Sequence, residues 1–213
     1  MFVLIAKAVC AYALGSISGS LLLGRRLGFD IRESGSGNAG GTNALRTRGW
    51  RFALGVVAID VGKGVLAVWL ALRLPTTAAS PGLYTEALVS GFAAVLGHVF
   101  PVFYGFRGGK GAATVVGTLA VLYPLALLPL LLVWLLLLGS TGYVGLATVT
   151  AGLCFVPLLW WLAPQIPALH LYAAACALLL VLTHAGNLRR LYHGTERRFE
   201  RARVLIRLFA GRR

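Results

Sequence analysis

The chain has 213 residues, of which 58% are hydrophobic and 12% are charged, and its mean hydropathy is +0.82. This composition excludes an ordinary soluble domain, whose surface must be largely polar, and predicts an integral membrane protein. The formal net charge of +14 does not indicate a nucleic-acid binder, because the charges lie between and after apolar stretches rather than on one aromatic-studded face.

Apolar runs predict the membrane spans, since a helix that crosses roughly 30 Å of hydrocarbon needs about 20 apolar residues. The first run lacks a basic start and a small-residue cleavage site, so we interpret it as a span and not as a signal peptide. Three cysteines lie in apolar stretches without metal-ligand spacing and predict packing only. The six runs lie at about 2–23, 52–73, 86–104, 112–138, 143–162 and 168–184.

The distribution of basic residues predicts the topology. Six lie between Arg25 and Arg51 and nine between Arg189 and Arg213, so the positive-inside rule places both segments in the cytoplasm. Because both segments are on the same side, the chain must cross the membrane an even number of times between them. Five apolar runs lie between the two segments, so one of these runs must cross twice. The run 112–138 is the candidate for a double crossing, because Pro124 interrupts it and disfavours helix at the residue before it. One long, proline-kinked helix is the alternative.

These arguments predict an all-α polytopic membrane protein of about seven transmembrane helices, with its N-terminus outside and its C-terminus in the cytoplasm. Residues 1–213 are predicted to form a single integral membrane domain. Residues 189–213 form its basic cytoplasmic tail, which we expect to be solvated beyond Phe199 and attracted to anionic lipid headgroups. The polar loops gather on the cytoplasmic side, and the oligomeric state is left open.

The segment GSGNAGGTNALR, residues 35–46, has an anion-binding composition. Its glycines allow close approach of the backbone, and Arg46 offers a bidentate fork that suits a phosphate group. Neutral hydrogen-bonding side chains accompany them at Ser36, Asn38, Thr42 and Asn43. A flexible linker without a ligand is the alternative.

A second glycine-rich segment, GFRGGKGAAT at residues 105–114, precedes an apolar helix. Backbone N–H groups and the ammonium of Lys110 would then lie at a helix N-terminus, where phosphate is favoured. The segment is not a Walker A loop, because Tyr104 stands at the position of the first glycine and Gly111 follows the lysine. His98 lies near the same rim, where a packed histidine is the alternative to a functional one.

Charged residues inside the apolar runs are costly and are usually functional or paired. Asp60 and Lys63 share one helical face, and pairing with each other or with a basic loop explains them at least as well as a functional role does. We interpret them as supporting residues rather than catalysts. Where the last run enters the tail, His184 and Asn187 can face the loops, and Glu196 is expected to order nearby arginines. The sequence offers no Ser/His/Asp triad and no clustering of histidines that would predict a metal site.

Four segments in order resemble the bacterial family of acyl-phosphate-dependent glycerol-3-phosphate acyltransferases. They are DIRESGSGNAGGTNALR, IDVGKG, GHVFPVFYGFRGGKGAAT and the tail with His184, Asn187, Gly194 and Glu196. The resemblance spans nearly the whole chain. It implies a seven-helix fold in the plasma or inner membrane, with an active site open to the cytoplasm. The implied reaction transfers a fatty acyl group from acyl phosphate to the sn-1 hydroxyl of glycerol 3-phosphate, without a cofactor or metal, to give lysophosphatidate and phosphate.

The resemblance also implies roles for particular residues. Lys110 and His184 would be catalytic, with the histidine as polariser or orienter, and an acyl-phosphate oxygen would accept the proton of the attacking hydroxyl. Four further residues would support the binding residues without touching the substrate: Asp60, Lys63, His98 and Glu196. The residues that would bind substrate are Ser36, Asn38, Thr42, Asn43, Arg46, Gly108, Gly109, Gly111 and Asn187.

The sequence departs from the family pattern before the sixth helix. Gly142 stands where the family usually has an arginine, and Gly145 stands where it has a serine of the phosphate pocket. Each loss is expected to weaken phosphate binding by about 1 to 3 kcal/mol. Ala185 also replaces a common arginine. A non-enzymatic or degenerate membrane paralogue that binds phosphate-bearing lipids or metabolites is therefore the alternative function.

Overall fold

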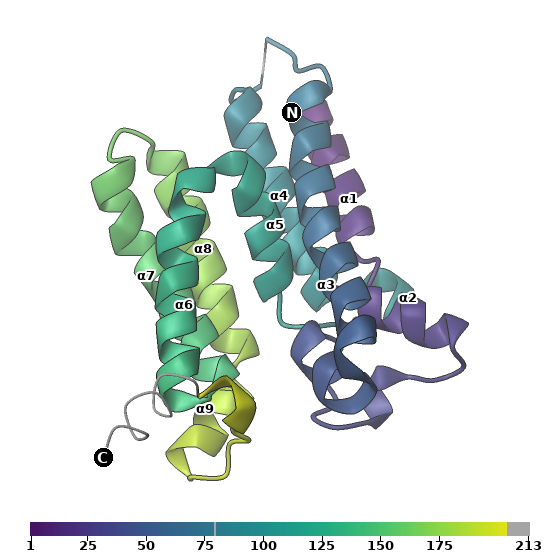
Figure 1. Cartoon of the computed structure of the whole chain (residues 1–213). Coiled ribbons are helices and arrows are strands. Elements are labelled where there is room, and N and C mark those ends of the chain that lie inside the picture. Colours follow the sequence, from purple (N-terminus) through teal and green to yellow (C-terminus); the bar gives the residue numbers. More distant parts are fainter. Residues whose placement is uncertain (79, 204–213) are drawn as a thin grey trace. The chain divides into compact units, whose positions relative to one another are not determined.

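A computed structural model describes residues 1–78 and 80–203. Within these residues every regular element is a helix, as the sequence predicts (Figure 1). The chain divides into two compact units, Met1–Pro124 and Leu125–Arg213, and each is described by itself. Whether they form one integral membrane domain stays a prediction.

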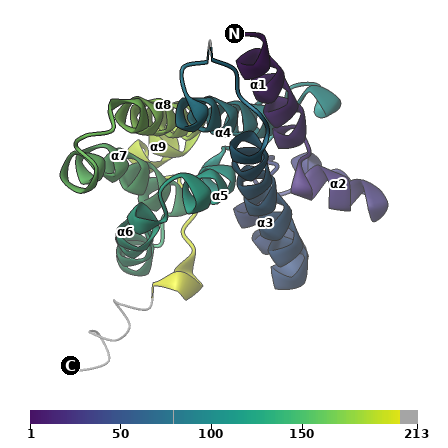
Figure 2. The ribbon, with the colours of Figure 1, turned by 90° about the horizontal axis from the view of Figure 1, so that it is seen from above.

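The first unit is a bundle of four long helices with one short helix beside it. Helix α1 packs along α4, while α3 packs against α4 and α5 (Figures 1 and 2). The short helix α2 packs beside the middle of α3, where a Cβ at Gly19 would lie 2.7 Å from the backbone oxygen of Val56. The helices are α1 (Phe2–Gly15), α2 (Gly19–Arg26), α3 (Gly41–Arg73), α4 (Leu83–Val99) and α5 (Ala112–Leu122), with short 3-10 helices η1 (Ile31–Glu33) and η2 (Val102–Tyr104).

The first apolar run is a bent pair of helices and not one straight span. Helices α1 and α2 meet at an angle of 45°. The bend is held by polar contacts, because Ser16 Oγ donates to the backbone oxygen of Tyr12 at 2.9 Å and the N–H of Gly19 donates to Asp60 Oδ1 at 3.1 Å. The carboxylate of Asp60 thus takes one of the backbone donors that a helix start leaves without a partner.

Helices α3 and α5 approach each other through glycine. A Cβ atom at Gly117 would overlap the backbone oxygen of Val61 on α3, and one at Gly64 would lie 2.5 Å from the backbone oxygen of Thr114 on α5. Small residues allow helix backbones to meet in membranes, where packing and not water exclusion drives association. The α3–α5 contact is therefore sensitive to any added side chain.

We expect Gly117→Ala to lower stability by about 1 to 3 kcal/mol, because the new methyl group forces two packed backbones apart. Gly62→Ala is the matched control, since nothing lies within 4 Å of a Cβ at that helical position. Thermal unfolding of both variants in detergent would measure the difference. Equal melting temperatures would contradict the close approach of α3 and α5.

The end of the first unit away from the glycine-rich loops is closed by a buried ion pair. Lys7 Nζ lies 2.6 Å from Glu86 Oε2 and also donates to the backbone oxygens of Ala71 and Leu74 at 2.9 Å. The other carboxylate oxygen of Glu86 accepts from the hydroxyls of Thr76 and Ser80. The pair satisfies both charges and ties the loop after α3 to α1 and α4.

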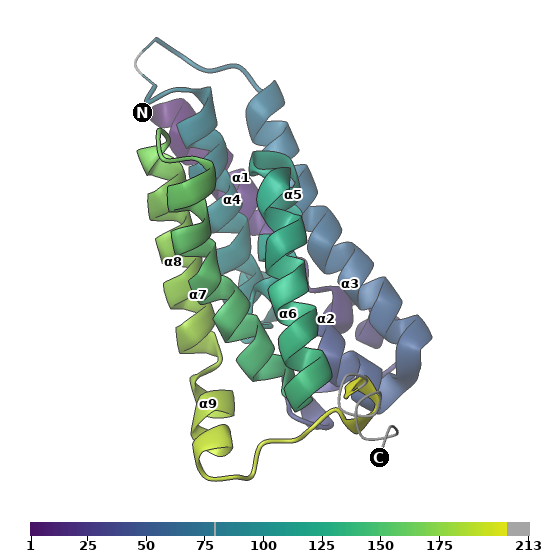
Figure 3. The same cartoon turned by 60° about the vertical axis from the view of Figure 1, so that its left-hand side comes forward.

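The second unit consists of three long helices and a short one that follows a bend. Helix α7 packs against α6 and α8 (Figure 3), and α8 meets α9 at an angle of 54°. The helices are α6 (Leu127–Thr141), α7 (Val144–Leu162), α8 (Pro167–Thr183) and α9 (Ala185–Tyr192), with 3-10 helices η3 (Pro124–Ala126) and η4 (Glu200–Ala202).

The predicted break at Pro124 is confirmed, and the alternative of one long kinked helix is wrong. Helix α5 ends at Leu122, Tyr123 has φ −157° and ψ 75°, and α6 begins at Leu127. Among the described residues, four helices are long and apolar enough to cross a membrane, six if each bent pair is one span, and α5 is a further, shorter apolar helix. The polytopic, all-helical class is confirmed, while the exact number of crossings and the orientation of the termini stay predictions.

Candidate active site

The first glycine-rich loop, residues 27–40 between α2 and α3, folds around the side chain of Asn43 in the first turn of α3. This side chain is 1% exposed. Its Nδ2 atom donates to the backbone oxygens of Ile31, Ser34 and Asn38 at 3.2, 3.0 and 3.1 Å. Its Oδ1 atom accepts from the N–H of Ser36 at 2.9 Å. Because both ends of the carboxamide bind the loop, this geometry favours a loop-shaping role for Asn43 over its predicted contact with a ligand.

We expect Asn43→Asp to lower stability by about 1 to 3 kcal/mol, because a carboxylate oxygen would then face three backbone oxygens that have lost their donor. Thermal unfolding in detergent would measure the loss. Glu33→Gln is the control, because it replaces a carboxylate by a carboxamide at an exposed position of the same loop. A melting temperature for Asn43→Asp equal to that of the control would contradict the loop-shaping role.

The other predicted residues of the segment 35–46 remain nearer the surface, with Ser36 and Asn38 in the loop and Thr42 and Arg46 in the first turns of α3. Ser36 is exposed, whereas Asn38, Thr42 and Arg46 are half-buried. Gly35 adopts φ 64°, and a Cβ there would overlap Asn43 Oδ1, so only glycine suits the position. The loop therefore keeps its shape through Asn43 while leaving Ser36 accessible.

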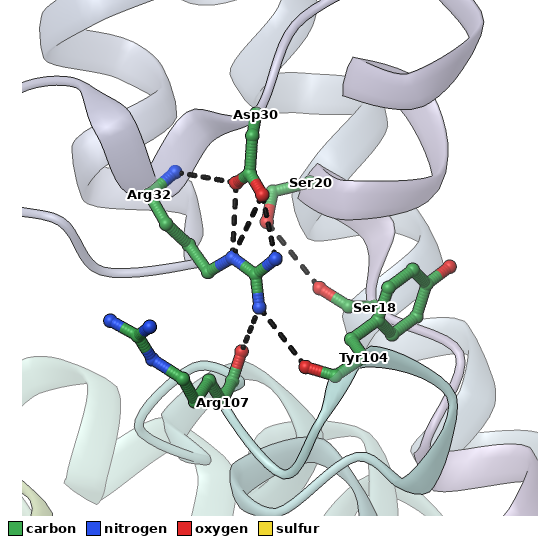
Figure 4. Close-up of polar contacts among 6 residues, drawn as sticks. All are labelled: Ser18, Ser20, Asp30, Arg32, Tyr104 and Arg107. Atoms are coloured by element: carbon green, nitrogen blue, oxygen red, sulfur yellow. Dashed lines mark hydrogen bonds and ion pairs between the residues drawn. The ribbon is translucent and has the colours of Figure 1, made fainter.

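Arg32 joins the first loop to the second (Figure 4). Its Nε and Nη2 atoms bind the carboxylate of Asp30 at 2.6–3.0 Å, and its Nη1 atom donates to the backbone oxygens of Tyr104 and Arg107 at 3.0 and 3.2 Å. The side-chain hydrogen bonds lower the pKa of Asp30 and raise the pKa of Arg32 from their ordinary values. The pair is thus ionised at neutral pH, and its stabilising effect is lost only as the pH falls through the lowered pKa of Asp30.

The second loop ends at the N-terminus of α5, as the sequence predicts. Gly111 is the residue before the helix and adopts φ 92°, and Lys110 precedes it with a half-buried side chain. A lysine at this place adds a charge to the backbone N–H groups of the first helical turn. The arrangement suits an anion.

Gly108 and Gly109 bring the second loop close to the end of α4 and to the first loop. Their N–H groups donate to the backbone oxygens of Val99 and His98 at 3.2 and 3.1 Å. A Cβ at Gly109 would overlap the ring of His98 and lie 2.8 Å from the backbone oxygen of Ala39, and one at Gly108 would also collide with protein atoms. Packing between the loops therefore explains both glycines, and their predicted contact with a second phosphate stays a prediction.

A buried network of Asp60, Lys63 and His98 lies beneath the second loop. Lys63 Nζ lies 3.0 Å from Asp60 Oδ1 and 2.8 Å from His98 Nδ1, and it donates to the backbone oxygen of Ile17 at 2.8 Å. All three side chains are at most 4% exposed. The predicted pairing of Asp60 with Lys63 is confirmed, and His98, which packs against Gly109, connects the pair to the loop.

In the second unit, Asn187 and Glu196 form a separate polar cluster. Asn187 Nδ2 donates to Glu196 Oε1 at 2.5 Å, and Arg190 Nε donates to Glu196 Oε2 at 2.7 Å. The expectation that Glu196 orders an arginine is confirmed. Gly145 lies beside this cluster, since a Cβ there would be 2.9 Å from the Cβ of Asn187.

His184 stands at the bend between α8 and α9 and is 5% exposed. Its Nδ1 atom lies 2.8 Å from the backbone oxygen of Leu180, which can only accept a hydrogen bond, so Nδ1 carries the proton. A neutral ring then has its lone pair on Nε2, the arrangement required of a proton acceptor or orienter. Its predicted role beside Lys110 stays a prediction.

The start of the tail, at Arg198 and Phe199, packs on the turn between α6 and α7. The N–H of Phe199 donates to the backbone oxygen of Gly142 at 2.8 Å, and Arg198 Nε donates to the hydroxyl of Tyr143 at 2.6 Å. Gly142 adopts φ 78°, and a Cβ there would lie 3.0 Å from Arg203 Cγ. Solvation of the tail beyond Phe199 stays a prediction, because residues 204–213 lie outside the described part of the chain.

Sequence reasoning missed the connecting role of Arg32 and the position of Gly145. The Asp30-x-Arg32 spacing is a signal for a local ion pair, which the structure shows. The resemblance gives Gly145 and Asn187 positions in a substrate site, but no local pattern marks them as direct neighbours, because the two residues lie on different helices.

Apolar helices that carry two anion-suited loops at one end define a polytopic membrane protein with a candidate anion site. The sequence profile of a family described as Glycerol-3-phosphate acyltransferase matches residues 5–194. The chain therefore belongs to the glycerol-3-phosphate acyltransferase family, a family of integral membrane acyltransferases in phospholipid synthesis.

Relatives and solved structures agree with this assignment. The chain is 43% identical to a glycerol-3-phosphate acyltransferase of Azotobacter vinelandii and 37% identical to one of Chlorobaculum parvum, with 90% and 93% of this chain and 97% of each relative covered. Crystal structures of PlsY (YgiH), an integral membrane glycerol 3-phosphate acyltransferase, superpose with a TM-score of 0.83. Its glycerol 3-phosphate form is 33% identical, with 92% of this chain and 95% of that chain covered, and its lysophosphatidic acid form is 32% identical, with 95% and 98% covered.

Proposed function

We propose that this chain transfers a fatty acyl group from acyl phosphate to the sn-1 hydroxyl of glycerol 3-phosphate and releases lysophosphatidate and inorganic phosphate. The observation that carries the proposal is the joining of two glycine-rich loops at one end of the first unit, with Lys110 two residues before the start of α5. Both substrates bear phosphate, and one bears a long acyl chain. Loops suited to anions at the end of apolar helices match that combination of groups.

The residues fall into two groups by their contacts. Ser36, Arg46 and Lys110, with Asn38 and Thr42, would bind phosphate oxygens. Asn187 and His184, which lie in the second unit, would keep the roles that the resemblance implies for them, substrate binding and polarisation or orientation. Asn43 would act by shaping the loop, and the buried network of Asp60, Lys63 and His98 would support the loop that carries Lys110. Glu196 would orient the carboxamide of Asn187, to which it is hydrogen-bonded. Relatives crystallised in a glycerol 3-phosphate form and a lysophosphatidic acid form support the substrate and the product.

The reaction needs little covalent help from the protein. The glycerol hydroxyl oxygen attacks the acyl carbon, the bond between that carbon and the phosphate oxygen breaks, and the hydroxyl proton passes to a phosphate oxygen of the donor. Phosphate is a good leaving group, so positioning and stabilisation of developing negative charge by Lys110 and Arg46 supply the catalysis. The proposed acyl transfer is complete without a cofactor.

The substrates also suggest where the reaction takes place. Glycerol 3-phosphate is water-soluble and acyl phosphate is amphiphilic, so the site would open to the cytoplasmic face of the plasma or inner membrane. The basic residues between Arg25 and Arg51 lie in and beside the first glycine-rich loop, which the positive-inside rule assigns to that face. Membrane lipids would surround the apolar helices.

Purified protein in detergent, supplied with radiolabelled glycerol 3-phosphate, tests the proposal. Palmitoyl phosphate should yield labelled lysophosphatidate, while palmitoyl-CoA and palmitoyl-acyl carrier protein should not. Product from the thioesters but not from the acyl phosphate would overturn the proposed donor. Binding of glycerol 3-phosphate without any product would instead support the non-enzymatic alternative, which the glycines at 142 and 145 favour.

A further inference from the structure

We propose that Arg32 is a positioning residue, which locks the two glycine-rich loops together so that the second loop presents Lys110 to the phosphate group of a substrate. This inference rests on the proposed function, since it adds a determinant of the same site. Arg32 itself would not touch the substrate.

The contacts of Arg32 use the whole guanidinium group. One edge, Nε and Nη2, lies on the carboxylate of Asp30, and Nη1 reaches two backbone oxygens of the second loop (Figure 4). Asp30 is fixed in turn, because its Oδ1 atom accepts from the N–H of Arg32 at 2.9 Å and so caps helix η1. A phosphate could bind this guanidinium only by displacing Asp30, which argues against a direct role in binding.

The backbone oxygens that Arg32 binds belong to a turn of unusual conformation. Gly105 and Phe106 have φ values of 65° and 60°, and a bulky residue such as Phe106 rarely adopts that region. Such a conformation persists only where its surroundings hold it. The N–H of Phe106 donates to the backbone oxygen of Pro101 at 2.9 Å, and hydrogen bonds from Arg32 to the oxygens of Tyr104 and Arg107 hold the turn on both sides of Gly105 and Phe106.

The position of Arg32 in the chain explains why the contact matters for the site. Ser36 lies four residues after Arg32, and Lys110 lies three residues after Arg107, so one side chain sets the spacing between two candidate phosphate ligands. The two loops also approach each other closely at Gly109, where a Cβ would lie 2.8 Å from the backbone oxygen of Ala39. A lysine cannot replace Arg32, because one ammonium cannot span a carboxylate edge and two carbonyl oxygens.

Arg32→Gln and Arg32→Lys, made in the full chain and purified in detergent, test the proposal by amide hydrogen exchange and by kinetics. Exchange should rise by about tenfold or more in residues 104–111 and not in α1 or α8. The KM for glycerol 3-phosphate should rise by about tenfold or more in both variants, with a smaller change in the KM for palmitoyl phosphate. Arg26→Gln, an exposed arginine on α2, should match the unmodified protein.

Several outcomes would overturn the proposal. They are unchanged exchange in residues 104–111, an unchanged KM despite faster exchange, and full activity of Arg32→Lys. If the unmodified protein forms no lysophosphatidate while loop exchange still rises in the variants, the proposed function fails and the link between the loops stands. Should the Arg32 variants fail to fold, Asp30→Asn, which keeps the shape of the partner and weakens the pair, is expected to give a smaller rise in the same residues.

Discussion

Replacement of Lys110 by methionine is expected to lower the rate of lysophosphatidate formation by at least about a hundredfold, the typical effect of removing one charge-stabilising group from an active site. The backbone on both sides of this lysine is fixed. Gly109 packs against His98 and Ala39, and Gly111 holds φ 92° against Val95. The backbone from which the Lys110 side chain projects is therefore fixed before α5. We expect its ammonium group to stabilise the negative charge of the transition state.

Steady-state rates with palmitoyl phosphate and glycerol 3-phosphate would measure this effect. Methionine keeps most of the length of the side chain, so circular dichroism and the melting temperature should stay those of the unmodified protein. Lys110→Arg keeps the charge and should retain more activity than Lys110→Met. A methionine variant within threefold of the unmodified rate would remove Lys110 from the catalytic group.

Removal of either member of the Asp60–Lys63 pair should destabilise the protein by about 3 to 5 kcal/mol, because it leaves an uncompensated buried charge. Lys63→Met would leave Asp60 with the N–H of Gly19 and with His98 as the remaining hydrogen-bonding groups at its carboxylate. Asp60→Asn would leave the ammonium of Lys63 inside the unit without its counter-ion. Both single variants should unfold at markedly lower temperature in detergent.

The double variant Asp60→Asn/Lys63→Met separates a charge effect from loss of shape. It removes both charges and keeps similar volumes, so it should recover much of the stability that each single variant loses. Thermal unfolding and resistance to protease in detergent would measure the recovery. Two single variants as stable as the unmodified protein, or a double variant less stable than both, would contradict the pairing.

Much of the fold could be predicted because the bilayer imposes strong rules on the sequence. Runs of about 20 apolar residues mark spans, and Pro124 marks a break because the residue before a proline avoids helix. The bend between α1 and α2 could not be predicted in the same way. It depends on the contact between the N–H of Gly19 and Asp60, which are 41 residues apart, and no local pattern indicates that contact.

The site could be predicted in composition but not in the role of each residue. Asn43 and Arg32 have the same chemistry whether they bind a ligand or a backbone, and only the folded loop shows that their donors meet protein oxygens. Gly145 was interpreted as the loss of a hydroxyl group. The structure shows in addition that its missing side chain allows α7 to lie directly against Asn187.

The most direct measurement is a phosphorus NMR time course of the purified protein with palmitoyl phosphate and glycerol 3-phosphate. Our account predicts that the acyl phosphate signal falls while lysophosphatidate and inorganic phosphate rise in equal amounts, and that Lys110→Met abolishes all three changes. Inorganic phosphate without lysophosphatidate, or no change in a folded protein that binds glycerol 3-phosphate, would contradict it.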